Sequence, residues 1–161
     1  DTIIGVEVVE GSDHDDIMST GSGVDSLYGG SGNDTLWLDA SGTGSAEVYD
    51  GGADEDILML DVSGGATVDL TAMTASVTNI EEIQFGADAH QLELSASVIK
   101  SMTDANNTMI ITGDANDSVV DSSGGWTLGG SAGGYSTYTK VDGGDTITLK
   151  VDDDISTVNL T

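Results

Sequence analysis

The sequence has no cysteine and no proline, and its only basic side chains apart from two histidines are three lysines. Without cysteine, disulfide bonds contribute nothing to the fold. The sequence contains no run of about 18 apolar residues, so we expect no membrane-spanning helix. The chain also starts without a charged segment followed by an apolar one, so no cleavable N-terminal signal is expected. Because these features are absent, the fold must be stabilised by short apolar segments and by whatever neutralises the charge of the chain.

The charge is strongly one-sided, with 29 acidic residues and a formal net charge of −26. Self-repulsion of this size destabilises a compact state unless cations neutralise it. Nucleic acid and anionic membranes are therefore poor partners. A high charge with few aromatic residues is typical of disorder, but 37% of the residues are hydrophobic and they recur at short, regular intervals. At 161 residues the chain suits one domain or two small ones.

Three consecutive nine-residue units organise the N-terminal part: GSDHDDIMS (11–19), TGSGVDSLY (20–28) and GGSGNDTLW (29–37). The third unit fits the pattern G-G-x-G-x-D-x-U-x at every fixed position. The aspartates at the sixth place are Asp16, Asp25 and Asp34, and the apolar residues at the eighth place are Met18, Leu27 and Leu36. This period predicts a glycine-rich turn of six residues followed by a short strand whose apolar residue points inward.

The same units predict a metal site. Glycine allows positive φ and lets backbone carbonyls approach an ion, and aspartate adds a hard oxygen ligand that suits Ca²⁺. Two later segments repeat the aspartate, namely GGADEDILM (51–59) with Asp56 and TGDANDSVV (112–120) with Asp117. The candidate Ca²⁺-binding residues are Asp16, Asp25, Asp34, Asp56, Asp117, Gly21, Gly23, Gly30, Gly32 and Gly52.

A weaker unit, SGTGSAEVY (41–49), lacks the aspartate but keeps an apolar residue, Val48, at the eighth place. The residue after it, Tyr49, stands at the ninth place, which we expect to point outward or to the edge. Tyr28 and Trp37 stand at the same place of their units. Together with Trp126 these aromatic residues either form a sugar-stacking surface or pack against the C-terminal part, and we favour packing.

These units resemble the RTX family of calcium-binding proteins. The resemblance implies a parallel β-roll in which each unit is half a coil and Ca²⁺ lies between stacked turns. Carried over to this chain, Asp16 and Asp34 would share one metal row, Asp25 would start the other, and Asp56 would pair with Asp34. The resemblance also implies export by the bacterial type I secretion machinery, with an uncleaved C-terminal signal, and an extracellular location.

After residue 60 the nine-residue period fades, but threonine and valine enrichment still indicates strands. One helix is expected near 95–103, with Ser95 as its N-cap. The segments NIEEI, LELSASVI, NTMIITGDANDSV, GGYSTYT and VDDDI, between residues 79 and 155, resemble the last portion of large RTX adhesins. We therefore expect an all-β fold: a parallel β-roll of calcium-binding repeats at 1–60 and a β-rich C-terminal cap with one short helix at 61–161.

A possible catalytic motif is the G-x-S-x-G match at 129–133, with Ser131 at its centre. That motif needs a strand before it, a helix after it and a histidine base nearby. Here glycines and a strand-like segment follow, so we predict no hydrolytic activity and regard the chain as not an enzyme.

The function that this sequence favours is a Ca²⁺-dependent structural module of a secreted bacterial surface adhesin. The module would be monomeric, would fold outside the cell on binding calcium, and would serve a parent protein that contacts a host or environmental surface. Two alternatives stay open. One is a ligand-binding domain of the adhesin that recognises a glycan or a surface. The other is the noncatalytic β-roll of a secreted protease or lipase.

Overall fold

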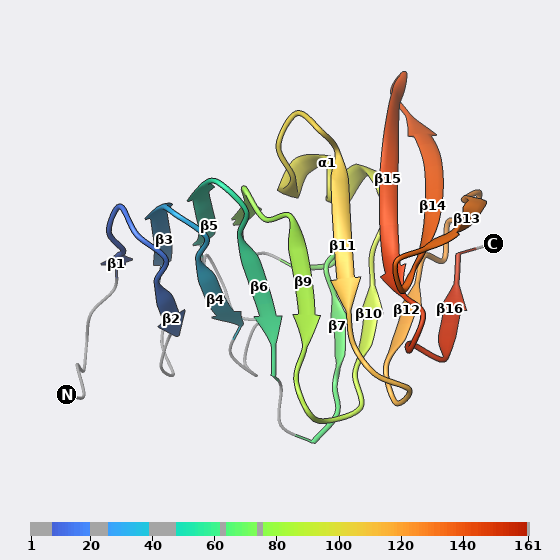
Figure 1. Ribbon diagram of the computed structural model, residues 1–161, viewed down its shortest axis with the longest axis horizontal. Coiled ribbons are helices and arrows are strands. Elements are labelled where there is room, and N and C mark those ends of the chain that lie inside the picture. Colours follow the sequence, from blue (N-terminus) through green and yellow to red (C-terminus); the bar gives the residue numbers. More distant parts are fainter. Residues whose placement is uncertain (1–7, 20–25, 39–47, 62–63, 74–75, 161) are drawn as a thin grey trace.

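Short strands stacked side by side build most of the fold. The stack extends from the N-terminal end to the C-terminal end of the molecule (Figure 1). The computed structural model describes residues 8–19, 26–38, 48–61, 64–73 and 76–160. Over these ranges there are one helix and sixteen strands, and the strands form three sheets. The expectation of an all-β fold with one short helix is confirmed.

The long sheet has eight strands and spans the whole molecule. Its order is β13 (Thr127–Ala132), β14 (Tyr135–Asp142), β15 (Asp145–Asp152), β11 (Thr108–Thr112), β9 (Glu82–Phe85), β6 (Ile57–Leu60), β4 (Thr35–Leu38) and β2 (Ile17–Ser19). Pairing is parallel from β15 to β2, and only β13, β14 and β15 pair antiparallel.

Two short parallel sheets complete the fold. The N-terminal short sheet contains β1 (Val8–Glu10), β3 (Ser26–Ser31), β5 (Val48–Ala53) and β8 (Ser76–Thr78). The C-terminal short sheet contains β16 (Thr157–Asn159), β12 (Ser118–Val120), β10 (Gln91–Glu93) and β7 (Thr67–Asp69). From β1 to β6 the chain alternates between the N-terminal short sheet and the long sheet, and from β9 to β12 it alternates between the long sheet and the C-terminal short sheet.

Three of the eighth-place apolar residues form a buried ladder in the long sheet. Met18, Leu36 and Leu58 lie opposite one another on β2, β4 and β6. The ladder continues through Ile83 and Ile111 into the C-terminal half. All five are buried, and burial of such a side chain stabilises the fold by about 1.5–3 kcal/mol. The parallel register thus follows from the period of the sequence, because each turn presents one apolar residue at one height.

The ninth-place prediction is wrong for Tyr49. Its side chain is fully buried and it lies opposite Leu27. Val48, the expected inward residue, is only half-buried. The segment that ends at 49 therefore stands one residue out of phase with its neighbour, and in a strand a shift of one residue exchanges the inner and outer faces. Trp126 is also buried, as expected for packing.

The one described helix, α1 (Ala96–Met102), lies where the sequence predicts it. Ser95 is the N-cap, and its hydroxyl oxygen accepts the backbone N–H of Val98 at 3.3 Å. The buried face consists of Ala96, Ile99 and Met102, spaced three residues apart. In the described residues no helix is long and apolar enough to span a membrane.

The long sheet crosses residue 60 without a break, because β6 pairs with β9, β9 with β11, and β11 with β15. The parallel stacking that we expected over 1–60 therefore continues to β15 in the long sheet and to β16 in the C-terminal short sheet. The division into a roll at 1–60 and a cap at 61–161 stays a prediction.

Candidate metal centre

Three predicted ligand residues stand in one row at the turns that precede β2, β4 and β6. The backbone N–H of Asp16 donates to Asp34 Oδ1 at 2.8 Å, and the N–H of Asp34 donates to Asp56 Oδ1 at 2.8 Å. The row follows from the register of the strands, because Ile17, Thr35 and Ile57 come directly after these aspartates and lie opposite one another. The predicted pairing of Asp56 with Asp34 is thus confirmed. We call Asp16, Asp34 and Asp56 the aspartate ladder.

The second oxygen of each carboxylate distinguishes the members of the ladder. Asp34 and Asp56 are 0% and 1% exposed, and the Oδ2 atom of each is buried with no hydrogen-bond donor. Asp16 lies at the exposed end, where its Oδ2 accepts the N–H of Ser12 at 2.7 Å and the hydroxyl of Ser12 at 2.8 Å. Buried polar groups nearly always have a partner, and an unpaired buried carboxylate is costly. The two orphaned oxygens therefore point to a cation.

Backbone carbonyls converge on the same places. A Cβ atom added to Gly29 would collide with both Asp34 Oδ2 and the carbonyl oxygen of Gly51. The first glycine of the nine-residue unit is thus required because oxygens occupy the space that a side chain would fill. Carboxylate and carbonyl oxygens together are the donor set that Ca²⁺ takes in proteins, so the residues fit the ion that the repeats imply.

The other predicted glycines shape the turn. Gly30, Gly32 and Gly52 have φ values of 113°, 108° and 109°, which L side chains rarely adopt. Asp54 holds the place in its unit that Gly32 holds in the preceding one, and it has a φ of 85°. Aspartate tolerates this region better than most residues, so the turn survives the substitution.

The electrostatics of the ladder favour a bound cation. Burial raises the pKa of Asp56 to about 6; the N–H of Asp34 opposes this shift, and the nearby carboxylates of Asp34 and Glu81 reinforce it. Burial also raises the pKa values of Asp34 and Glu81. These carboxylates face one another in a poorly solvated place, and a divalent cation beside them favours their ionised forms.

Asp117 keeps the position of a ladder aspartate but not its unpaired oxygen. It is buried in front of β12, and its Oδ1 accepts the N–H of His90 at 2.9 Å. Its Oδ2 accepts the N–H of Asp114 at 2.8 Å. Both oxygens are therefore already hydrogen-bonded, and a metal-binding role for Asp117 stays a prediction.

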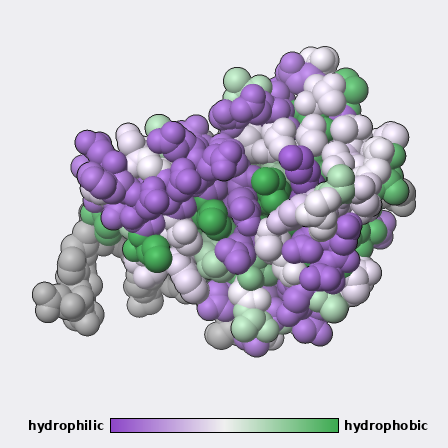
Figure 2. Space-filling view, viewed as in Figure 1, coloured by the Kyte–Doolittle hydropathy of each residue, from purple (hydrophilic) through white to green (hydrophobic). Residues whose placement is uncertain are grey.

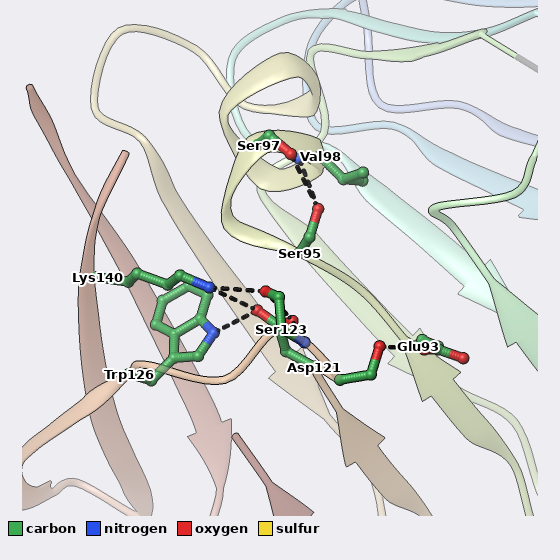
Figure 3. A network of polar contacts seen from close by, with 9 residues as sticks. Glu93, Ser95, Ser97, Val98, Asp121, Ser123, Trp126 and Lys140 are labelled. Carbon is green, nitrogen blue, oxygen red and sulfur yellow. Dashed lines mark hydrogen bonds and ion pairs between the residues drawn. The ribbon is translucent and has the colours of Figure 1, made fainter. Parts of the chain in front are cut away.

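A further buried carboxylate, Asp121, has no counterpart in the sequence predictions. Its Oδ2 accepts the indole N–H of Trp126 at 2.7 Å and the Lys140 ammonium at 3.2 Å, and its Oδ1 accepts the backbone N–H of Ser123 at 2.8 Å (Figure 3). Lys140 also lies 5.7 Å from the centre of a Trp126 ring. Burial opposes ionisation of Asp121, but the hydrogen bonds from Ser123, Trp126 and Lys140 outweigh it and hold the pKa below its usual value.

Three predicted ligand residues, Asp25, Gly21 and Gly23, lie outside the described residues, so the second metal row is not part of this geometry. Within the described ranges, no group of three or more His, Asp or Glu side chains is placed to hold a metal ion. A metal on the ladder would therefore rely on carbonyl oxygens in addition to carboxylates.

The ladder, its glycine turns and its hard-oxygen donors are the features that a calcium-binding repeat needs. Residues 10–40 match the sequence profile described as the RTX calcium-binding nonapeptide repeat (4 copies), which is the repeat that the sequence resembles. RTX nonapeptide repeats bind Ca²⁺ and are structural modules of secreted proteins. No curated protein and no solved structure gives a significant match to the chain.

Proposed function

We propose that this chain is a Ca²⁺-dependent structural module of a secreted bacterial surface adhesin, in which residues 1–60 form a parallel β-roll and residues 61–161 cap it. The observation that carries the proposal is the pair of buried oxygens, Asp34 Oδ2 and Asp56 Oδ2, that have no donor. Parallel stacking of the strands on which the ladder stands supports the β-roll. The proposed ligand set keeps the remaining predicted residues, namely Asp16, Asp25, Asp117, Gly21, Gly23, Gly30, Gly32 and Gly52.

The proposal explains how folding is coupled to location. The chain carries a net charge of −26, and without cations its acidic turns repel one another. Where Ca²⁺ is millimolar, metal binding adds free energy that the metal-free chain lacks. Extracellular calcium modules have Kd values on the order of 10⁻⁴–10⁻³ M, and sites of this strength would fill outside a cell and stay empty inside it.

Type I secretion and the adhesin are the finer parts of the proposal. They are supported by the RTX repeats, which are typical of secreted proteins, and by the resemblance of the segments between 79 and 155 to the end of large RTX adhesins. Those segments contain all or part of β9, β10, α1, β11, β12, β14 and β15. The type I secretion machinery, and a host or environmental surface reached through the parent protein, are the proposed partners.

We also propose that the module is noncatalytic. Ser131 lies on β13, which leads into a turn and a second strand. Its hydroxyl lies 2.7 Å from that of Ser136, which donates to Asp153 at 2.7 Å. A nucleophile elbow instead leads into a helix and has a histidine base. The imidazole of His90 is buried beside Asp117, not beside Ser131.

Circular dichroism of the whole chain during a Ca²⁺ titration tests the proposal. We expect strand signal to rise with Ca²⁺ and to fall when a chelator is added, with Mg²⁺ a poor substitute because it holds its water and demands a tighter octahedron. Asp34→Ala should move the Ca²⁺ midpoint to higher concentration. Asp13→Ala, an exposed residue of the same series of turns, is the control. A wild type that is fully folded in chelator would contradict the proposal.

A further inference from the structure

The ladder does not end with Asp56, in the unit 51–59. The N–H of Asp56 donates to Glu81 Oε2 at 3.1 Å, just as the N–H of Asp34 donates to Asp56. Glu81 comes directly before β9, which pairs with β6, so it stands at the height where the next ladder aspartate would stand. No aspartate unit is present there, and the longer glutamate side chain takes that place.

A carbonyl also continues the series. In the preceding turn, a Cβ on Gly29 would collide with Asp34 Oδ2 and the carbonyl oxygen of Gly51. In this turn, a Cβ on Gly51 would collide with Asp56 Oδ2 and the carbonyl oxygen of Asn79. Asn79 therefore supplies the oxygen that Gly51 supplies one turn earlier, although it belongs to no repeat.

Asn79 is held in the conformation that this role requires. Its φ is 52°, a left-handed conformation that asparagine adopts more readily than most residues. Its side-chain amide donates to Asp50 Oδ1 at 2.7 Å, next to Gly51. The following residue, Ile80, donates its N–H to the carbonyl of Met102 at the end of α1, at 3.0 Å. The Asn79 carbonyl is thus fixed from both sides.

We propose that Asp56 Oδ2 and the carbonyl oxygen of Asn79 are protein ligands of a Ca²⁺ site beside Gly51, which closes the metal row outside the repeats. Glu81 is a positioning residue, because it holds the backbone N–H of Asp56. This inference rests on the proposed function and extends its metal row by one site. Ca²⁺ takes 6–8 oxygens, so water completes the coordination.

The surroundings suit a hydrated cation. A groove of about 340 Å³ is lined by Asp56 and by four further carboxylates, those of Glu55, Glu81, Glu82 and Asp104. Lys150 also lines this groove, and the carboxylates leave it with a negative balance of charge beside Asp56. Hydrophilic residues also cover much of the N-terminal half of the face shown in Figure 2.

Two measurements on the whole chain test the site. In crystals grown with Ca²⁺, we expect an anomalous difference peak about 2.3–2.6 Å from both Asp56 Oδ2 and the Asn79 carbonyl oxygen. In isothermal titration calorimetry, Asp56→Asn should bind one Ca²⁺ fewer than the wild type. Asp154→Asn makes the same change of charge at an exposed residue that does not line the groove and should bind the wild-type number.

The outcomes separate this inference from the function on which it rests. If crystals show Ca²⁺ beside Asp34 but no peak between Asp56 and Asn79, the closing site is wrong and the calcium-dependent module stands. If the wild type binds no Ca²⁺ by calorimetry, both are wrong. If Asp56→Asn does not fold, the anomalous map of the wild type decides alone.

Discussion

Two regions of the molecule bury carboxylates in opposite ways. In the N-terminal half, Asp34 and Asp56 each keep one oxygen without a donor. In the C-terminal half, both oxygens of Asp117 accept backbone N–H groups, and those of Asp121 accept hydrogen bonds from Ser123, Trp126 and Lys140. In our proposal the first region takes a cation from solution, whereas the second supplies its own donors, including an ammonium group. The comparison predicts that calcium stabilises the two regions unequally.

The largest effect is expected at Asp121. Removing one partner of a buried ion pair leaves an uncompensated charge and costs about 3–5 kcal/mol. Asp121→Ala leaves the indole N–H of Trp126 without its acceptor and leaves Lys140, whose side chain is 20% exposed, with the Ser123 hydroxyl. We therefore expect a loss near the lower end of this range in the free energy of unfolding, with or without Ca²⁺. Urea denaturation in Ca²⁺ and in chelator measures it. Asp154→Ala, at an exposed residue, is the control, and a loss seen only in Ca²⁺ would contradict the comparison.

The effect of Asp34→Asn on stability should have opposite signs with and without Ca²⁺. In chelator the variant removes a buried charge whose Oδ2 atom has no donor, so we expect it to be more stable than the wild type by about 1–3 kcal/mol. In saturating Ca²⁺ it loses a ligand and should be less stable. Thermal melts under both conditions test the inversion. Destabilisation of the variant in chelator would contradict the proposal that the Asp34 carboxylate is a cation ligand.

The pH dependence of the metal-free protein should also separate the regions. The folded-state pKa of Asp56 is raised from 3.8 to about 6, so its contribution to stability is fully present below 3.8 and is lost as the pH rises through 6. The pKa of Asp121 is lowered from 3.8, so its contribution is present above 3.8 and is lost at more acidic pH. In chelator, the melting temperature should therefore fall from pH 4.5 to pH 7, and Asp56→Asn should reduce that slope.

The smallest effect is expected at an exposed ion pair. Lys100 on α1 lies 2.6 Å from Asp145 Oδ2 at the start of β15, and their side chains are 35% and 53% exposed. The ion pair, led by its hydrogen bond, raises the pKa of Lys100, but solvent and salt screen such pairs. We expect Lys100→Met to lower the melting temperature far less than Asp121→Ala does. The decrease caused by Lys100→Met should be smaller still in high salt.

The aspartate ladder and the strands that carry it could be predicted from the sequence. One period of nine residues sets both the inward apolar residue and the turn aspartate, so Leu36 and Asp34 take their places together. The helix could be predicted because Ser95 is a local cap for an apolar face. Each of these signals lies within a dozen neighbouring residues.

What the sequence could not predict depends on contacts between distant segments. Glu81 completes the ladder from 25 residues beyond Asp56, and Asn79 does so through a backbone atom that no residue type encodes. Lys140 reaches Asp121 from 19 residues away. Tyr49 turns inward because its strand pairs one residue out of phase, which becomes visible only in the register with Leu27.

Hydrogen exchange of backbone amides, compared in Ca²⁺ and in chelator at pH 7, tests the central claim most directly. The amides of Leu36 and Leu58 report on the strands beside the aspartate ladder, and those of Ile111 and Leu149 report on β11 and β15. We predict that chelation removes protection from the first pair by a large factor and leaves most of the protection of the second. Equal loss at all four amides, or no loss at any of them, would contradict the account.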